Sequence, residues 1–148
     1  MRILMYCLII LAIIAIAATV FVRVAPVDAA DWHVDPEDVT APGSRNFALL
    51  AGAEALRIDA PALSVAGRVQ AIAEAEGAQV LAGSVAEGHV TYIVRTRLMG
   101  FPDFISIRLV PEDEMTRLHI FSRSRYGESD FGVNTARVQR WLSAARGE

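Results

Sequence analysis

This 148-residue sequence has one cysteine, no lysine and no excess of basic charge. The single cysteine, Cys7, excludes a disulfide framework and a zinc site built from several thiolates. The formal net charge is -3, and a general nucleic-acid-binding protein needs a basic face, so nucleic acid is not an expected partner. Hydrophobic residues make up 53% of the chain, which excludes a mainly disordered protein.

Familiar catalytic and cofactor motifs are missing as well. The chain has no G-x-S-x-G nucleophile turn and no Gly-rich phosphate loop. No two histidines are spaced i, i+2 or i, i+4, so His89 and His119 are expected to be structural. The sequence therefore predicts no cofactor and no metal site, and it favours a non-catalytic protein.

Ile3 to Val22 is a run of twenty residues without charge, glycine or proline. Twenty helical residues span about 30 Å, the thickness of the hydrocarbon core of a bilayer. Twelve of the twenty are Leu, Ile, Val or Phe, which favour insertion by about 4 to 7 kcal/mol. We expect residues 1–23 to be a transmembrane anchor that contacts the membrane through residues 3–22. A cleaved signal peptide is the alternative, because Val27-Asp28-Ala29 offers small residues to a signal peptidase.

The charges flanking this run suggest an orientation. The amino terminus and Arg2 lie on one side and Arg23 on the other, and the short N-terminal tail favours a cytoplasmic N-terminus. All fourteen basic residues are arginine, as in GC-rich bacterial genomes. We therefore expect a single-pass protein of the bacterial inner membrane with a periplasmic domain.

Residues 24–45 contain three prolines and five acidic residues, which is typical of an extended juxtamembrane linker. Trp32 and His33 have two interpretations: they lie at the headgroup level, or they are the first docked residues of the domain. Residues 46–148 then form the soluble domain.

Two amphipathic helices are predicted in this domain. Asp59-Ala60-Pro61 is a start signal for the first, which ends at Gly77. Asn134 is the expected N-cap of the second, which ends at Gly147. The apolar faces consist of Ala62, Val65, Ala66, Val69, Ile72 and Ala73 in the first helix and Val138, Trp141, Leu142 and Ala145 in the second.

Four segments with a period of two lie between these helices: 78–85, 89–98, 104–110 and 117–123. Short connections favour antiparallel pairing. Residues 56–58 have the composition of a further short strand. The fold class predicted is α+β: an N-terminal transmembrane helix, then a four-stranded, mostly antiparallel sheet with two helices packed on one face.

The richest candidate site is the stretch from Ser122 to Asn134, followed by Arg137. Arg123 and Arg125 share one face of a strand, with serines opposite, and two adjacent guanidiniums need an anion between them. That anion is either Asp130 or Glu128, in a network that holds the loop, or a bound carboxylate or phosphate. Free amides at the start of the helix after Asn134, together with Arg137, would add to such an anion site.

A second candidate is the loop Gly100-Phe101-Pro102-Asp103-Phe104. It is either a turn closed by aromatic side chains or an aromatic lip beside the arginines. The candidate binding residues are Arg123, Arg125, Asp130, Asn134, Arg137, Phe101 and Asp103.

The motifs in these two stretches resemble the uncharacterised family called domain of unknown function 1499. The resemblance covers roughly residues 46–142 and rests on the phenylalanine–aspartate turn, the Ser122–Gly127 run, the Ser129–Asn134 loop and Arg137-Val138. Family members often carry an Asn-Cys-Val-Ser segment, whereas here Asn46 is followed by Phe47, Ala48 and Leu49. The resemblance implies domain boundaries but no reaction.

Three functions are compatible with these features. The first is a non-catalytic module that binds an anionic small molecule, a lipid headgroup or a membrane-protein partner through Arg123, Arg125 and Arg137. The second is an enzyme acting on an anionic or lipidic substrate, with Asp130 or Asp103 as the base and arginines as electrostatic stabilisers. The third is an accessory subunit bound through its membrane helix. We favour the first.

Overall fold

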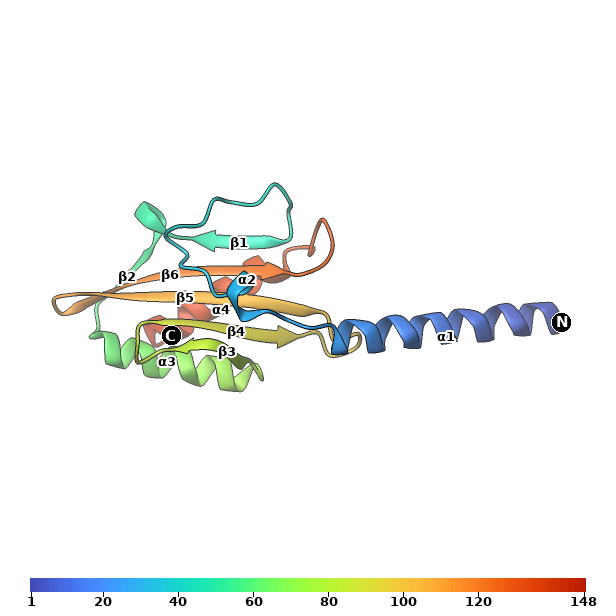
Figure 1. The fold of residues 1–148 in the computed structure, drawn as a ribbon. Helices are drawn as coiled ribbons and strands as arrows, with labels where there is room; N and C mark the ends of the chain where they lie inside the picture. Colours follow the sequence, from blue (N-terminus) through green and yellow to red (C-terminus); the bar gives the residue numbers. More distant parts are fainter.

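A long N-terminal helix projects from a small α+β domain in the computed structural model, which describes residues 1–148 (Figure 1). This helix, α1, spans Arg2–Val24 and is exposed along nearly its whole length. Over 18 of its residues α1 has a mean hydropathy of 2.9, so it is long and apolar enough to cross a membrane. A signal sequence has the same length and apolar character. Only its end joins the domain, where Val22 and Ala25 are buried.

The domain is built on an antiparallel sheet of six strands. The strands lie in the order β1-β6-β5-β4-β3, and β2 also pairs with β6, beyond the end of β1. Their bounds are Phe47–Leu50 (β1), Leu56–Ile58 (β2), Gln79–Ser84 (β3), His89–Arg95 (β4), Pro102–Glu112 (β5) and Met115–Ser124 (β6), with a 3-10 turn, η1, at Gly52–Glu54.

The antiparallel α+β class is confirmed, but the prediction of four strands is wrong. The two additional strands are β1 and β2, which have four and three residues, and β2 coincides with the short strand that the composition of residues 56–58 suggests. Every residue of β1 is half-buried, so its side chains carry no alternation from which a strand is recognised. Both become strands only by pairing with the long strand β6.

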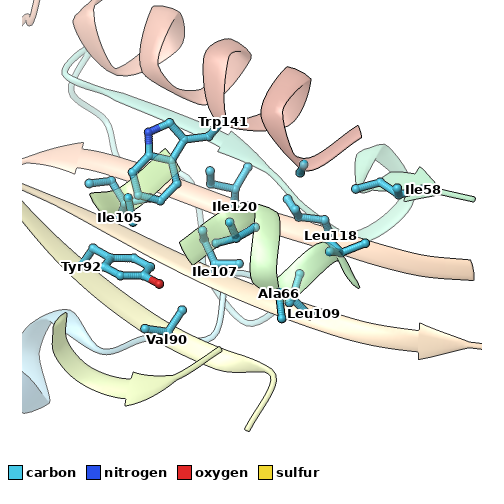
Figure 2. Close-up of a cluster of buried hydrophobic side chains, with 14 of the residues drawn as sticks. Ile58, Ala66, Val90, Tyr92, Ile105, Ile107, Leu109, Leu118, Ile120 and Trp141 are labelled. Carbon is cyan, nitrogen blue, oxygen red and sulfur yellow. The ribbon is translucent and has the colours of Figure 1, made fainter. Parts of the chain in front are cut away.

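Helices α3 (Ala62–Ala75) and α4 (Val133–Arg146) cover one face of the sheet, as expected. Their predicted apolar faces are confirmed, since Val65, Val69 and Trp141 are almost fully buried. Figure 2 shows Tyr92, Trp141 and the isoleucines and leucines of β5 and β6 filling the space between sheet and helices. The core cluster contains 16 buried residues, and burial of this apolar area is the main term that stabilises the domain.

The opposite face of the sheet is crossed by residues 28–37, which we call the strap. The strap contains the short helix α2 (Ala29–Trp32) and passes in front of the strands in Figure 1. The indole of Trp32 stacks on the ring of Phe104 in β5, with centroids 3.8 Å apart. His33 stacks on His89 in β4 at 3.9 Å, and its Nδ1 lies 2.9 Å from Thr91 Oγ1. Of the two interpretations of Trp32 and His33, the structure therefore shows docking on the domain.

Candidate functional site

Asn134 is the centre of a buried polar network between β6 and α4. Its side-chain Oδ1 accepts hydrogen bonds from Ser122 Oγ at 2.5 Å and from Arg137 Nη1 at 2.9 Å. Its Nδ2 donates to the carbonyl oxygen of Asn46 and to Ser124 Oγ, each at 3.0 Å. Asn134 is fully buried, so all of its hydrogen-bonding capacity is used inside the protein.

Arg137 forms a buried ion pair with Asp103. Arg137 Nη2 lies 2.8 Å from Asp103 Oδ2, and the two side chains are 6% and 5% exposed. A buried guanidinium without a carboxylate partner would be strongly destabilising. The charge of Arg137 is thus neutralised within the fold, at the position where the sequence analysis expected it to face a ligand.

Asp130 caps α4. Its Oδ2 accepts from the backbone N–H of Asn134 at 2.6 Å, and its Oδ1 accepts from that of Gly132 at 3.0 Å. Burial tends to raise the pKa of this carboxyl, but the two backbone donors outweigh burial and bring the pKa below its ordinary value. The expectation that Asn134 is the N-cap is therefore wrong: Gly132 is the N-cap, and Asp130 supplies the capping carboxylate.

Arg123 lies on the other face of the sheet, beneath the strap. Its guanidinium carbon is 4.6 Å from the ring centroid of Trp32 and 4.8 Å from that of Phe121. Its Nη2 donates to the carbonyl oxygens of Asp31 and Trp32 at 3.2 and 3.4 Å. Burial lowers the pKa of Arg123, and cation–π contacts with two rings stabilise its charge.

The three predicted arginines do not meet. Arg125 follows β6, and its guanidinium carbon lies 5.4 Å from the ring centroid of Tyr126. Arg123 faces the strap, whereas Arg137 extends from α4 to Ser122 and Asp103 on the opposite side of the sheet. No shared anion site connects them, and neither of the alternative partners, Asp130 and Glu128, forms a salt bridge with any of the three.

A pocket of about 410 Å³ does bring three of the predicted residues together: Phe101, Asp103 and Asp130. No arginine or histidine lines it. Phe101 and Tyr126 meet edge to face at 5.9 Å, and Phe131 is 97% exposed. The lining residues are Thr96, Phe101, Pro102, Asp103, Ser124, Tyr126, Gly127, Ser129, Asp130, Phe131 and Val133.

This pocket lies at the end of the domain from which α1 departs. The loop between β4 and β5, which supplies Thr96 and Phe101, is fastened to the end of α1. Arg95 Nη1 donates to the carbonyl oxygens of Val22 and Gly100 at 3.4 and 3.1 Å. Gly100 is required there, because its φ is +76° and a Cβ would lie 2.7 Å from Arg23 Cγ.

The contacts of the strap with the sheet have almost no counterpart in the sequence pattern. Ser106 Oγ donates to the carbonyl oxygen of Trp32 at 3.2 Å, and Asp35 pairs with Arg108 at 3.4 Å. His89 Nε2 lies 3.1 Å from the carbonyl oxygen of Val34. The only signal in the sequence is the pair of rings at Trp32 and His33 within a segment of acidic and small apolar residues.

The pocket offers a ligand mainly apolar surface, because its two carboxylates already have partners. Asp103 and Asp130 both line it, but the first is paired with Arg137 and the second with two backbone amides. No group of three or more His, Cys, Asp and Glu side chains is arranged to hold a metal ion. Aromatic rings, a proline and a valine supply most of the apolar wall that remains, and small or hydroxyl-bearing residues complete it: Thr96, Ser124, Gly127 and Ser129.

No curated protein matches this chain. Residues 34–144 match the family described as "Protein of unknown function (DUF1499)". The match begins inside the strap, at Val34, and includes β1 to β6, α3 and most of α4. The polar network, the helix cap and the pocket thus all lie within the matched region. The chain belongs to the DUF1499 family of proteins of unknown function.

Proposed function

We propose that this protein is a membrane-anchored, non-catalytic module that holds the apolar part of a membrane lipid in the pocket between the β4–β5 loop and the loop before α4. The proposal places α1 in the bacterial inner membrane, with the N-terminus in the cytoplasm and the domain in the periplasm. The supporting observation is the position of an apolar, cation-free pocket at the α1 end of the domain.

The contacts of α1 with the domain support an anchor over a removable signal sequence. Val22 and Ala25 are buried, and Arg23 Nη2 donates to the carbonyl oxygen of Leu98 at 3.3 Å. The candidate cleavage site lies in the strap, where the Asp28 side chain accepts from the backbone N–H of Ala30 and caps α2. Cleavage there would remove contacts that hold the β4–β5 loop.

The lining of the pocket supports a lipid chain over an anionic ligand. An anionic group needs a cation or free amides, whereas this pocket offers two carboxylates and no arginine. The same carboxylates do not favour an enzyme. A general base needs a free carboxylate within reach of its substrate, whereas Asp103 is paired with Arg137 and Asp130 accepts from two backbone amides. Phe101, Phe131 and Val133 instead provide surface that gains about 25 cal/mol for each Å² of apolar area removed from water.

Photocrosslinking tests this proposal. The full chain is reconstituted into bilayers that contain a phospholipid with a photoreactive acyl chain, and crosslinked peptides are identified by mass spectrometry. We expect crosslinks in residues 124–133 as well as in α1. The variant Val133→Trp, which fills the pocket, should lose the 124–133 crosslinks and keep those in α1.

Leu63→Trp is the matched control, since Leu63 is exposed on α3 and does not line this pocket. It should leave both sets of crosslinks unchanged. Crosslinks confined to α1 in the wild-type protein would refute the lipid pocket and leave the anchor standing. Crosslinks absent from α1 as well would refute the anchor.

A further inference from the structure

The tip of the β4–β5 loop presents an apolar side chain to solvent on a rigid turn. Leu98 is 84% exposed. The backbone N–H of Thr96 donates to Phe101 O at 3.0 Å, and that of Gly100 donates to Thr96 O at 2.9 Å. The Thr96 hydroxyl also accepts from the backbone N–H of Phe101 at 3.0 Å. Three hydrogen bonds therefore close the turn, and the exposure of Leu98 is built into the fold.

The loop lies beside the last turn of the apolar run in α1. Thr19 Oγ1 lies 3.5 Å from Met99 Sδ, and Arg23 Nη2 donates to Leu98 O. Thr19 belongs to the uncharged run and precedes Arg23 by four residues, which is about 6 Å along the helix axis. A bilayer that covers Thr19 therefore reaches Met99 as well.

Cations surround this apolar tip. Arg97 is exposed directly before Leu98, and Arg23 lies against the other side of the loop, at Gly100. Apolar side chains next to arginines are typical of protein segments that lie in the membrane interface. The arginines extend toward lipid phosphates while Leu and Met enter the acyl boundary.

We infer that the β4–β5 loop is a second membrane contact. Leu98 and Met99 enter the edge of the leaflet that α1 leaves, and Arg97 and Arg23 lie at the level of the phosphates. The partner of this surface is a phospholipid bilayer. The inference rests on the proposed anchoring by α1, because the depth of the loop is fixed by its contacts with Thr19 and Arg23.

Such a contact explains how a lipid would reach the pocket. Thr96 and Phe101 belong both to this loop and to the pocket wall. With Leu98 in the leaflet, the pocket opens at the bilayer surface, and an acyl chain reaches it without crossing water. The loop also prevents the domain from rotating freely on α1.

Site-specific fluorescence tests this inference in the full chain reconstituted into bilayers of phosphatidylcholine and phosphatidylglycerol. A polarity-sensitive dye is attached at Leu98→Cys in a Cys7→Ala background. Leu63→Cys is the control, since Leu63 is 82% exposed, nearly the same as Leu98. The native Cys7, exposed in α1, is labelled in the wild-type chain to report on the anchor.

We expect the dye at 98 to emit at shorter wavelength than the dye at 63. Spin-labelled lipids should quench it several-fold more strongly, and aqueous iodide should quench it less. Equal spectra and equal quenching at 98 and 63, with lipid quenching at Cys7, would overturn the inference and leave the anchor intact. A Cys7 label without lipid quenching would refute the anchor and the inference together.

Discussion

Replacing Asp103 by Asn tests the assignment of Arg137 to the fold. The substitution keeps the shape of the side chain and removes its charge, so the buried Arg137 guanidinium loses its hydrogen-bonded carboxylate and keeps only the longer ion pair with Glu76. The guanidinium is 6% exposed, and its Nε has no hydrogen-bond partner. The remaining partners are the neutral oxygens of Asn134 and Ser122, with Glu76 at 3.9 Å.

Breaking a buried ion pair from one side costs about 3 to 5 kcal/mol. That is a large part of the total stability of a single domain, which is about 5 to 15 kcal/mol. We therefore expect Asp103→Asn to lower the free energy of unfolding by about 3 to 5 kcal/mol. The double variant Asp103→Leu, Arg137→Met should cost less than the sum of its single changes, because neither partner is left unpaired.

Urea unfolding of the full chain in mild detergent measures these changes, with Trp141 as the reporter. Trp141 is buried and meets Tyr92 edge to face at 5.5 Å, so its fluorescence follows the core. Arg140→Gln is the matched control, because the side chain of Arg140 is 54% exposed and its pair with Glu76 is worth less than about 1 kcal/mol. A loss for Asp103→Asn no larger than that of the control would refute the structural role of the pair.

Three further predictions concern the strap and the helix cap. Burial lowers the pKa of His33 and of His119 below 6.5, so the unfolded chain binds more protons than the folded chain as the pH falls. Unfolding titrations should therefore show that the free energy of unfolding decreases below about pH 6.5 and depends little on pH between 7 and 8. Trp32→Ala should lower the free energy of unfolding by about 2 kcal/mol, because it removes the stacking on Phe104 and the cation–π contact with Arg123. Hydrogen exchange should become faster in the strap and stay unchanged in α3, whereas an equal acceleration in both would contradict this. Asp130→Ala should lower the free energy of unfolding by about 1 kcal/mol and speed up hydrogen exchange of the backbone amides at the start of α4. Exchange at the wild-type rate there would show that the cap is dispensable.

The sequence predicts the core of the domain well because its periodicity is strong. Residues at three-and-four spacing in α3 and α4 and at a spacing of two in β4, β5 and β6 are those that the structure buries. The strand β1 carries no such pattern, and β2, although its composition suggests a strand, is only three residues long. They exist because the long strand β6 offers an edge on which two short segments pair.

The alternation of side chains along β6 is predicted correctly, yet the arginines expected to form one cluster lie on opposite faces of the sheet. The expected alternation places Arg123 opposite Ser122 and Ser124, and the structure shows both serines bonded to Asn134 on the α4 side. The alternation in the sequence does not determine which face of β6 is covered by α4. Once α4 covers the serine face, Arg137 joins the serines, and Arg123 meets the strap.

The strap and the pocket depend on contacts across long sequence separations. Trp32 meets Phe104, and the loop at 96–101 meets the end of α1. Neither contact has a period or a spacing that predicts it. The aromatic lip suggested by Phe101 is part of the pocket, and of the three predicted arginines Arg125 lies near it, against the ring of Tyr126.

Native mass spectrometry of the full chain, extracted from membranes in mild detergent, tests the central claim most directly. If the pocket at the α1 end holds a lipid chain, the wild-type protein retains one phospholipid, and Val133→Trp releases it while Leu63→Trp does not. A wild-type protein without bound lipid, or a lipid retained equally by Val133→Trp, would contradict the claim.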